Sequence, residues 1–346
     1  MIYFVGWGVL YVSLFLIVLT RYRLRLIGYA PIIIFALIAV FRGSTGTDTA
    51  NYETRFYEVN FENYYLLFEP GFGLLAALLS STLGSPELGV RSVSALFFLI
   101  MAYYLRKANR DETFVLLAFY APAYFYAYSM NALRIGIASA IFLIASQMLM
   151  RGSRMKSYIW IGLSFTFHYT ISFVVFYLVV NLLKVTKWWK ILSLVIIGSL
   201  IFIFIQGRIF QKLDLYTESE RPSALSGLSN LVAIALLAIG VLLSSLSLRF
   251  RLSIFILAIS ITSIMYFDSI IGYAGLRFLN LISFSIPILV LISHQLEEKL
   301  LNLKMKTFIL LSGLSALAAT YRGWMQSYGV GKSPFLPYEF FSNMNI

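Results

Sequence analysis

Long apolar runs recur along the chain, and the polar stretches between them are short. Ten runs of 14 to 21 residues contain no lysine, arginine, aspartate or glutamate. An α-helix needs about 20 apolar residues to cross about 30 Å of hydrocarbon, so the shorter runs require flanking residues or a thinner bilayer. The pattern predicts ten transmembrane helices, at residues 1–20, 26–41, 92–105, 113–133, 135–150, 191–207, 231–248, 252–267, 278–296 and 307–321.

Two further apolar stretches do not have the length of one span. Residues 72–83 are too short, and they follow a turn-like Glu-Pro-Gly sequence. Residues 157–183 are too long for one upright helix and too short for two, and His168 lies near their middle. We expect the first stretch to re-enter the membrane without crossing it, and the second to break into two half-helices near His168.

The composition agrees with a lipid environment. Hydrophobic residues make up 60% of the 346 residues and charged residues 12%, against about 45–50% and about 25% in soluble proteins. A soluble fold of this length does not have enough interior to bury so much apolar surface. The absence of cysteine excludes disulfide scaffolds, cysteine nucleophiles and iron–sulfur clusters, and two histidines do not favour a multi-histidine metal centre.

The net charge of +12 follows the predicted topology. Basic residues gather in six short loops, which the positive-inside rule places in the cytoplasm. These loops carry 17 Lys and Arg against 4 Asp and Glu, whereas the rest of the chain carries 10 against 11. The charge is therefore a topology signal and gives no reason to expect nucleic-acid binding.

In this topology both termini lie outside. The chain is predicted to form a single transmembrane domain over residues 1–346, with outer loops at 42–69 and 208–230 and an outer tail at 322–346. The second loop is polar with mixed charge, and it is either a mobile lid or an ordinary solvated loop.

Aromatic residues are spaced regularly in the first outer loop. Four of them are separated by multiples of four residues: Tyr52, Phe56, Tyr64 and Phe68. This spacing predicts an amphipathic helix in the membrane interface. Its aromatic face is either an anchor among the headgroups or a surface that stacks on sugar rings, with Tyr52 as a candidate contact.

Three arginines from separate segments map to the outer leaflet: Arg42, Arg134 and Arg277. Ionisable groups at the membrane edge are candidate functional residues. One planar guanidinium group can bind two oxygens of a pyrophosphate at once. We therefore predict that these arginines bind a pyrophosphate. The structural alternatives are a snorkelling side chain or an ion pair with Asp48 for Arg42, and an ion pair with Asp268 for Arg277.

Asp48 and His168 are the candidate general bases, because a base that works near neutral pH is best supplied by histidine or by a perturbed carboxylate. The alternative for His168 is a hydrogen-bonded core residue. A helix broken at membrane depth is tolerated only where it is buried or lines a cavity. The chain has no paired-acid, P-loop, G-x-S-x-G or H-E-x-x-H motif, so we expect neither a metal nor another cofactor.

Residues 41–52, with the sequence FRGSTGTDTANY, resemble the arginine–glycine–threonine–aspartate signature near the N-terminus of the EpsG family of bacterial polysaccharide polymerases. That family is similar to the Wzy-type O-antigen polymerases. Further features look like the same family: Glu69-Pro70-Gly71-Phe72, Asn131-Ala132-Leu133-Arg134, and Phe167-His168 after a basic loop. Arg277 in a late span fits the resemblance less tightly.

The resemblance implies an all-α polytopic membrane protein with about ten transmembrane helices plus re-entrant or broken helices, similar to GT-C-like glycosyltransferases that use lipid-linked sugars. It implies a bacterial inner-membrane enzyme that moves a growing glycan from undecaprenyl pyrophosphate to a lipid-linked repeat unit at the outer face. Arginines would take the place of a metal. A chain-length regulator is an expected partner, beside the lipid bilayer.

Two other classes of protein remain open. A ligase that attaches finished glycan to another acceptor has the same hydropathy. A flippase or transporter also has many spans and buried charges, but it typically has internal repeats and charges near the bilayer midplane. The charges predicted here lie mostly at the outer edge, which argues against a transporter.

Overall fold

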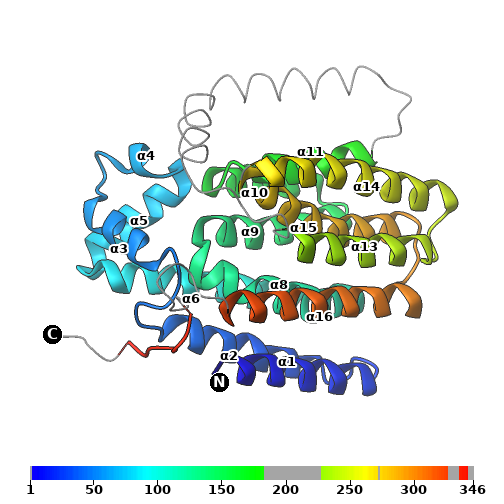
Figure 1. The fold of residues 1–346 in the computed structure, drawn as a ribbon, viewed down its shortest axis with the longest axis horizontal. Helices are drawn as coiled ribbons and strands as arrows, with labels where there is room; N and C mark the ends of the chain where they lie inside the picture. The colour runs from blue at the N-terminus through cyan, green and yellow to red at the C-terminus, as the bar shows by residue number, and fades with distance from the viewer. Residues whose placement is uncertain (1, 183–226, 272, 326–334, 342–346) are drawn as a thin grey trace. The chain divides into compact units, whose positions relative to one another are not determined.

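The computed structural model describes residues 2–182, 227–271, 273–325 and 335–341. Within these residues every regular element is a helix, and the strand-like feature is an isolated bridge between Arg42 and Phe340. Six of the described helices are long and apolar enough to cross a membrane, by length and composition. The chain is an all-α, multi-pass membrane protein (Figure 1).

Six helices meet this criterion: α1 (Ile2–Leu19), α6 (Pro86–Lys107), α9 (Leu133–Met150), α14 (Leu248–Ile271), α15 (Tyr273–Leu296) and α16 (Leu303–Met325). Shorter apolar helices are found at residues 25–40, 70–83 and 228–242. The predicted span at 191–207 and most of the predicted loop at 208–230 lie outside the described residues. The expected number of ten spans therefore stays a prediction.

The chain divides into two compact units. One consists of residues 1–171 together with 313–346, and the other of residues 172–312. All of the predicted site residues except Arg277 belong to the first unit.

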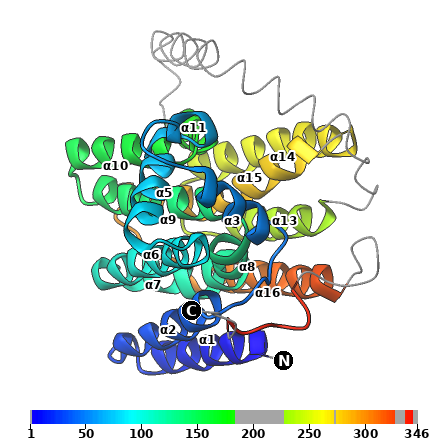
Figure 2. The same ribbon diagram turned by 90° about the vertical axis from the view of Figure 1, so that its left-hand side faces the viewer.

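The first unit is a row of helices that pack side by side. Its order is α1, α2 (Tyr29–Val40), α6, α9 and α10 (Arg154–Phe167), as Figure 2 shows. Hydroxyl groups bind α10 to α9, because Ser164 Oγ donates to the Ala138 carbonyl (2.6 Å) and Ser157 Oγ to that of Ala145 (2.9 Å). Such bonds between helices are common where lipid provides no hydrophobic force for association.

The predicted span at 113–133 is a helix with two π-helical turns. It runs through α7 (Arg110–Val115), η2 (Leu116–Tyr120), α8 (Ala121–Tyr126) and η3 (Ala127–Asn131), of which η2 and η3 are the π-helical parts. π-helical turns change which carbonyls are used within the helix and are frequent at functional sites. The carbonyls of η3 bind residues from the 42–49 loop, as described below.

The aromatic-rich outer loop is not one helix, so that prediction is wrong. It forms α3 (Thr49–Glu58) and α4 (Tyr64–Leu67), with a turn between them. The turn is closed by asparagine side chains, since Asn60 Oδ1 accepts from the Asn63 backbone N–H (3.0 Å) and Asn63 Nδ2 donates to the Glu58 carbonyl (2.9 Å). Asparagine favours such turns over a continued helix.

The aromatic spacing nevertheless separates a buried row from an exposed one. Tyr52, Phe56 and Phe68 are buried, whereas Tyr57 and Phe61 are 82% and 52% exposed. The buried row packs against α5 (Pro70–Leu83) and α6. Part of the predicted interface face is therefore core of the first unit.

The predicted break at His168 is confirmed. Helix α10 ends at Phe167, His168 has an extended backbone, and α11 (Ile171–Leu182) begins three residues later. The residues 72–83 lie in α5, a short helix that ends at Gly84 in the left-handed conformation (φ 64°), which favours glycine. The first ambiguous segment is therefore part of one short helix, and the second is divided between two.

The second unit is built from α11, α13 (Leu228–Leu242), α14, α15 and the first part of α16. Helix α15 packs against both α13 and α14, and most of its side chains are buried. The hydroxyl of Ser312 in α16 donates to the Ala233 carbonyl in α13 (2.9 Å). Arg277 lies on α15 and is exposed, whereas the side chain of its predicted partner Asp268 lies outside the described part of the chain.

Candidate functional site

Arg42 anchors the loop at residues 42–49, which we call the signature loop. Its side chain is completely buried, and its Nη1 donates to the Ser94 hydroxyl (2.9 Å) and to the carbonyls of Ser129 (3.2 Å) and Ala39. Ser129 belongs to η3, so a carbonyl of the π-helical turn holds the arginine. The snorkelling alternative is wrong for Arg42, because the guanidinium points into the protein.

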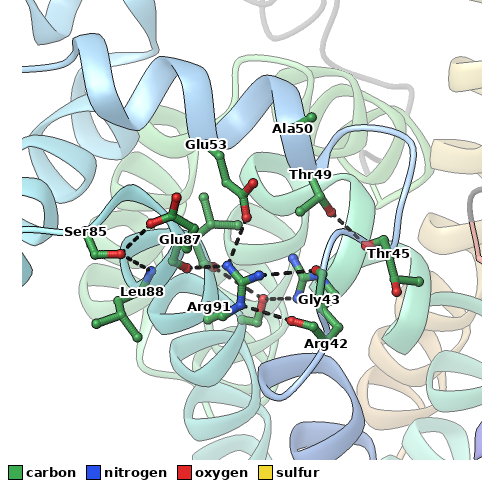
Figure 3. Close-up of polar contacts among 12 residues, drawn as sticks. Arg42, Gly43, Thr45, Thr49, Ala50, Glu53, Ser85, Glu87, Leu88 and Arg91 are labelled. Atoms are coloured by element: carbon green, nitrogen blue, oxygen red, sulfur yellow. Dashed lines mark hydrogen bonds and ion pairs between the residues drawn. The ribbon is translucent and has the colours of Figure 1, made fainter. Parts of the chain in front are cut away.

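Arg91 of α6 also holds the signature loop, although it was not among the predicted site residues. It lies in the second turn of α6, and its Nε and Nη2 donate to the carbonyls of Arg42 (3.0 Å) and Gly43 (3.2 Å). Its Nη1 forms an ion pair with Glu53 of α3 at 2.9 Å. Figure 3 shows this network, in which the buried Arg91 guanidinium bonds the backbone carbonyls at the start of the signature loop.

Asn131, the last residue of η3, holds the other end of the signature loop. Its Oδ1 accepts from the Asp48 backbone N–H (2.9 Å) and from the Thr47 hydroxyl. Gly46, the residue before Thr47, has φ 117°, and a Cβ there would lie 2.9 Å from the Met130 carbonyl oxygen. The loop therefore needs glycine at this position both for its conformation and for space.

Glu69, His168 and Arg134 form a compact charged group, which we call the Glu69 trio. One carboxylate oxygen of Glu69 accepts from His168 Nδ1 (2.8 Å), and the other accepts from Arg134 Nη1 (2.7 Å). Glu69 and His168 are 3% and 9% exposed, whereas Arg134 is 21% exposed. Arg134 is therefore the member of the trio whose side chain is accessible from outside the protein.

Three interruptions of helical structure bring the Glu69 trio together. Glu69 is the residue before α5, which starts with Pro70, and proline is favoured in the first turn of a helix. His168 is the residue after α10, and Arg134 lies in the first turn of α9. The three side chains meet because α5 and α9 both pack against α10.

The charge of Glu69 is set by its two partners. Burial by itself would raise the pKa of this carboxyl group, but the hydrogen bond from His168 and the charge of Arg134 outweigh burial and hold the pKa well below its usual range. A depressed pKa means that the ionised carboxylate stabilises the fold fully above the unfolded-state pKa, and this contribution is lost progressively as the pH falls below it towards the folded-state pKa. Glu69 is therefore an anion at neutral pH.

Aromatic side chains enclose the trio. Phe68 is buried, and the Arg134 guanidinium carbon lies 5.9 Å from the centre of its ring, within the range of a cation–π contact. The Tyr52 side chain of α3 lies beside the Arg134 guanidinium. Tyr52 also packs on Phe72, with ring centres 6.1 Å apart. The enclosed, low-dielectric setting strengthens the electrostatic effect of the trio.

The structure brings some of the predicted site residues together and separates others. Arg134 and His168 meet on Glu69, and Tyr52 lies beside Arg134. Asp48 is half-buried in the signature loop.

The remaining two arginines do not join this group. Arg42 is buried behind the signature loop, with its Nη1 bonded to the protein. Arg277 lies in the second unit, so its role in binding pyrophosphate stays a separate prediction. No cluster of three or more His, Cys, Asp or Glu side chains that could hold a metal ion is found within the described residues.

Two important residues were not predicted from the residues alone. Glu69 was marked only by its resemblance to a family motif, although an acidic residue directly before a helix-starting proline is a recognisable signal. Arg91 directly precedes the apolar run at 92–105, and no prediction was made for it.

The fold and the charged group define a multi-pass membrane protein with an ionisable site at the ends of its helices. The sequence profile of the EpsG family matches residues 25–340, which is nearly the whole chain. The protein belongs to the EpsG family, whose members resemble Wzy-type polysaccharide polymerases. No curated protein and no solved structure matches the chain.

Proposed function

We propose that this protein is a polysaccharide polymerase that uses undecaprenyl-pyrophosphate-linked glycans at the outer face of the bacterial inner membrane. In the reaction, a sugar hydroxyl of one lipid-linked repeat unit attacks the anomeric carbon of the growing glycan. The new glycosidic C–O bond forms as the bond to pyrophosphate breaks. The observation that carries this proposal is the Glu69 trio, a histidine and an arginine joined by one buried carboxylate.

His168 accepts the proton of the attacking hydroxyl in this proposal. The Glu69 carboxylate holds the hydrogen on Nδ1, which makes Nε2 the basic ring nitrogen. A carboxylate that fixes the tautomer of a histidine and stabilises its protonated form is a recurrent arrangement in enzymes. Asp48 is the alternative base. The support for it is weaker, because it lies in the signature loop and is not part of the Glu69 trio.

Arg134 stabilises the leaving pyrophosphate. With His168 neutral, the charges of Glu69 and Arg134 cancel, and the trio carries no net charge. When His168 takes the proton, the trio becomes positive at the moment that negative charge develops on the pyrophosphate. A positive charge beside the developing negative charge of the pyrophosphate stabilises the transition state electrostatically. Tyr52, beside Arg134, is proposed to contact the glycan.

Arg277 remains a proposed second pyrophosphate contact. For Arg42 the geometry supports another role, because a completely buried guanidinium reaches a ligand only if the signature loop opens. We therefore propose that Arg42 acts through the loop that it anchors.

The proposed function is tested by deleting the gene and measuring the size and membrane sidedness of the lipid-linked glycan. We expect single repeat units to accumulate on the outer leaflet and polymer to disappear. Single units that stay on the cytoplasmic side would replace the polymerase with a flippase. Full-length polymer retained on its lipid carrier would replace it with a ligase.

Chelation is expected to leave the activity intact. Arginine charge can stabilise a pyrophosphate leaving group without a metal, so washed membranes should form polymer at an unchanged rate in excess EDTA. The measurement is polymer length and yield with and without chelator. Loss of polymer that is restored by a divalent cation would contradict a metal-independent mechanism.

Gly71→Ala is expected to reduce polymer at least about 10-fold, because it separates Glu69 from His168. A Cβ at Gly71 would lie 2.3 Å from the Thr166 hydroxyl and 3.1 Å from the Thr166 carbonyl carbon, so α5 must move away from α10. Gly162→Ala is the matched control, since no atom lies within 4 Å of its added Cβ. Equal polymer yield from both variants would contradict the close packing of α5 on α10.

A further inference from the structure

Residues 335–341, which we call the C-terminal strap, return from the end of the chain to the signature loop. The backbone N–H of Gly43 donates to the Glu339 carbonyl (2.7 Å), and that of Phe341 donates to the Phe41 carbonyl (2.9 Å). These two bonds frame the antiparallel bridge between Arg42 and Phe340. The strap therefore pairs with the beginning of the signature loop as a short two-stranded ribbon.

The near end of the strap is anchored on an aromatic cluster of the first unit. Phe335 stacks on Trp324 at 5.2 Å between ring centres, and its carbonyl accepts from the Tyr3 hydroxyl (3.1 Å). The hydroxyl of Tyr338 donates to the Ile38 carbonyl at the end of α2 (2.7 Å). Helices α1, α2 and α16 thus all hold the strap in place.

The far end of the strap contacts Arg91. The guanidinium carbon of Arg91 lies 3.9 Å from the centre of the Phe341 ring, which is a close cation–π contact. Arg91 also bonds the backbone of the signature loop and the carboxylate of Glu53. Phe341 therefore covers the guanidinium that fixes the loop and the start of α3.

Helix α3 connects this network to the Glu69 trio. It begins at Thr49, the last residue of the signature loop, and its buried face carries Tyr52 and Phe56. Tyr52 packs on Phe72 and lies beside Arg134, and Phe56 packs against Phe68, the residue before Glu69. A shift of the signature loop must therefore move side chains that touch the trio.

We propose that the C-terminal strap is a positioning element, which holds the signature loop and α3 so that Tyr52 and Arg134 keep their places in the site. This inference rests on the proposed function only for its effect on polymer synthesis. Its structural part, the immobilisation of the signature loop by Phe341 and Arg91, is independent of the reaction.

Truncation tests the proposal. A chain that ends at residue 334 is expected to insert in the membrane but to lose polymer at least about 10-fold, because misplaced catalytic groups lose rate steeply. A chain that ends at residue 341 keeps the strap and is the matched control. Wild-type polymer from the shorter chain would overturn the inference.

A second readout does not depend on activity. Thr49 in the signature loop is 1% exposed, and the protein has no cysteine, so Thr49→Cys is the only thiol for labelling with a maleimide. We expect labelling to be at least about 10-fold faster in the chain that ends at residue 334 than in the full chain. Equal labelling rates would overturn the proposed immobilisation of the loop, whatever the fate of the polymer.

The aromatic contact is tested with two conservative variants. Phe341→Tyr keeps the ring face above Arg91, whereas Phe341→Leu keeps apolar bulk without it. We expect the tyrosine variant to retain polymer and the leucine variant to lose it several-fold. Equal activity of the two would assign Phe341 a simple packing role and overturn its part in positioning Arg91.

A reversible cross-link distinguishes a fixed strap from one that must open. A Cβ at Gly43 would lie 3.2 Å from the Glu339 Cβ, which is slightly less than the usual separation of about 3.5–4.5 Å in disulfides. The Gly43→Cys/Glu339→Cys variant is expected to be equally active when oxidised and when reduced. Activity that falls on oxidation and returns with reductant would overturn a fixed positioning role.

These results separate the two proposals. Loss of polymer in Glu69→Gln together with normal polymer in the chain ending at 334 would reject the strap and keep the catalytic trio. Normal polymer in Glu69→Gln together with fast labelling of Thr49→Cys in the truncated chain would reject the trio and keep the strap as the element that holds the loop.

Discussion

Glu69→Gln is expected to abolish polymer synthesis while the protein remains in the membrane. The amide keeps the shape of the carboxylate but has no charge, so it neither stabilises protonated His168 nor fixes the Nδ1–H tautomer. Loss of a tautomer-fixing carboxylate lowers enzyme rates by about 10⁴-fold in the best-studied case. We expect a loss of about 10³-fold or more, measured as polymer formed per amount of membrane protein.

Glu58→Gln is the matched control for this substitution. Glu58 is exposed at the end of α3 and undergoes the same chemical change outside the trio, so polymer should be unchanged. If Glu69→Gln formed normal polymer, the trio would not be catalytic. Asp48→Asn, compared in the same assay, would then decide whether the signature loop supplies the base.

Arg42→Ala and Arg134→Ala are expected to fail in different ways. Arg42 is completely buried among α2, α6 and η3, so its removal leaves a cavity and breaks three hydrogen bonds. The cost is about 3 kcal/mol or more, and folded protein should fall several-fold. Arg134 is partly exposed and its carboxylate partner keeps His168, so Arg134→Ala should leave most of the protein folded but remove polymer.

The measurement is the amount of monodisperse protein after extraction in mild detergent, together with the polymer made by the same membranes. Arg42→Met is an informative third variant, since it restores apolar volume without charge. Wild-type protein levels and no polymer in both Arg42 variants would contradict the structural role and return Arg42 to the pyrophosphate site.

Much of the architecture followed from local patterns. The apolar runs predicted most of the described helices, and the excess length of residues 157–183 predicted the break that the structure places at His168. Length and polarity are properties of contiguous residues, so they can be read without knowing the fold. The aromatic loop was predicted less well, because Asn60 and Asn63 end a helix that the spacing alone would continue.

The candidate site was predicted only in part. Arg134 and His168 were recognisable as costly polar residues in apolar surroundings, and the structure joins them. Arg42 had the same signal, yet its guanidinium turns inward to the carbonyl of Ser129, 87 residues away. A sequence shows that a charge lies at the membrane edge, but it does not show whether that charge faces a ligand or the core.

The sequence by itself determined that this is an all-α membrane protein of the EpsG family, with arginine, histidine and acidic residues at the ends of its helices. These features follow from hydropathy and from short motifs, which are local. Only the tertiary structure decided that Glu69 joins His168 to Arg134 and that the strap returns to the signature loop. Such contacts join residues 65 to 300 positions apart, and packing of whole helices, rather than any local preference, determines which of them meet.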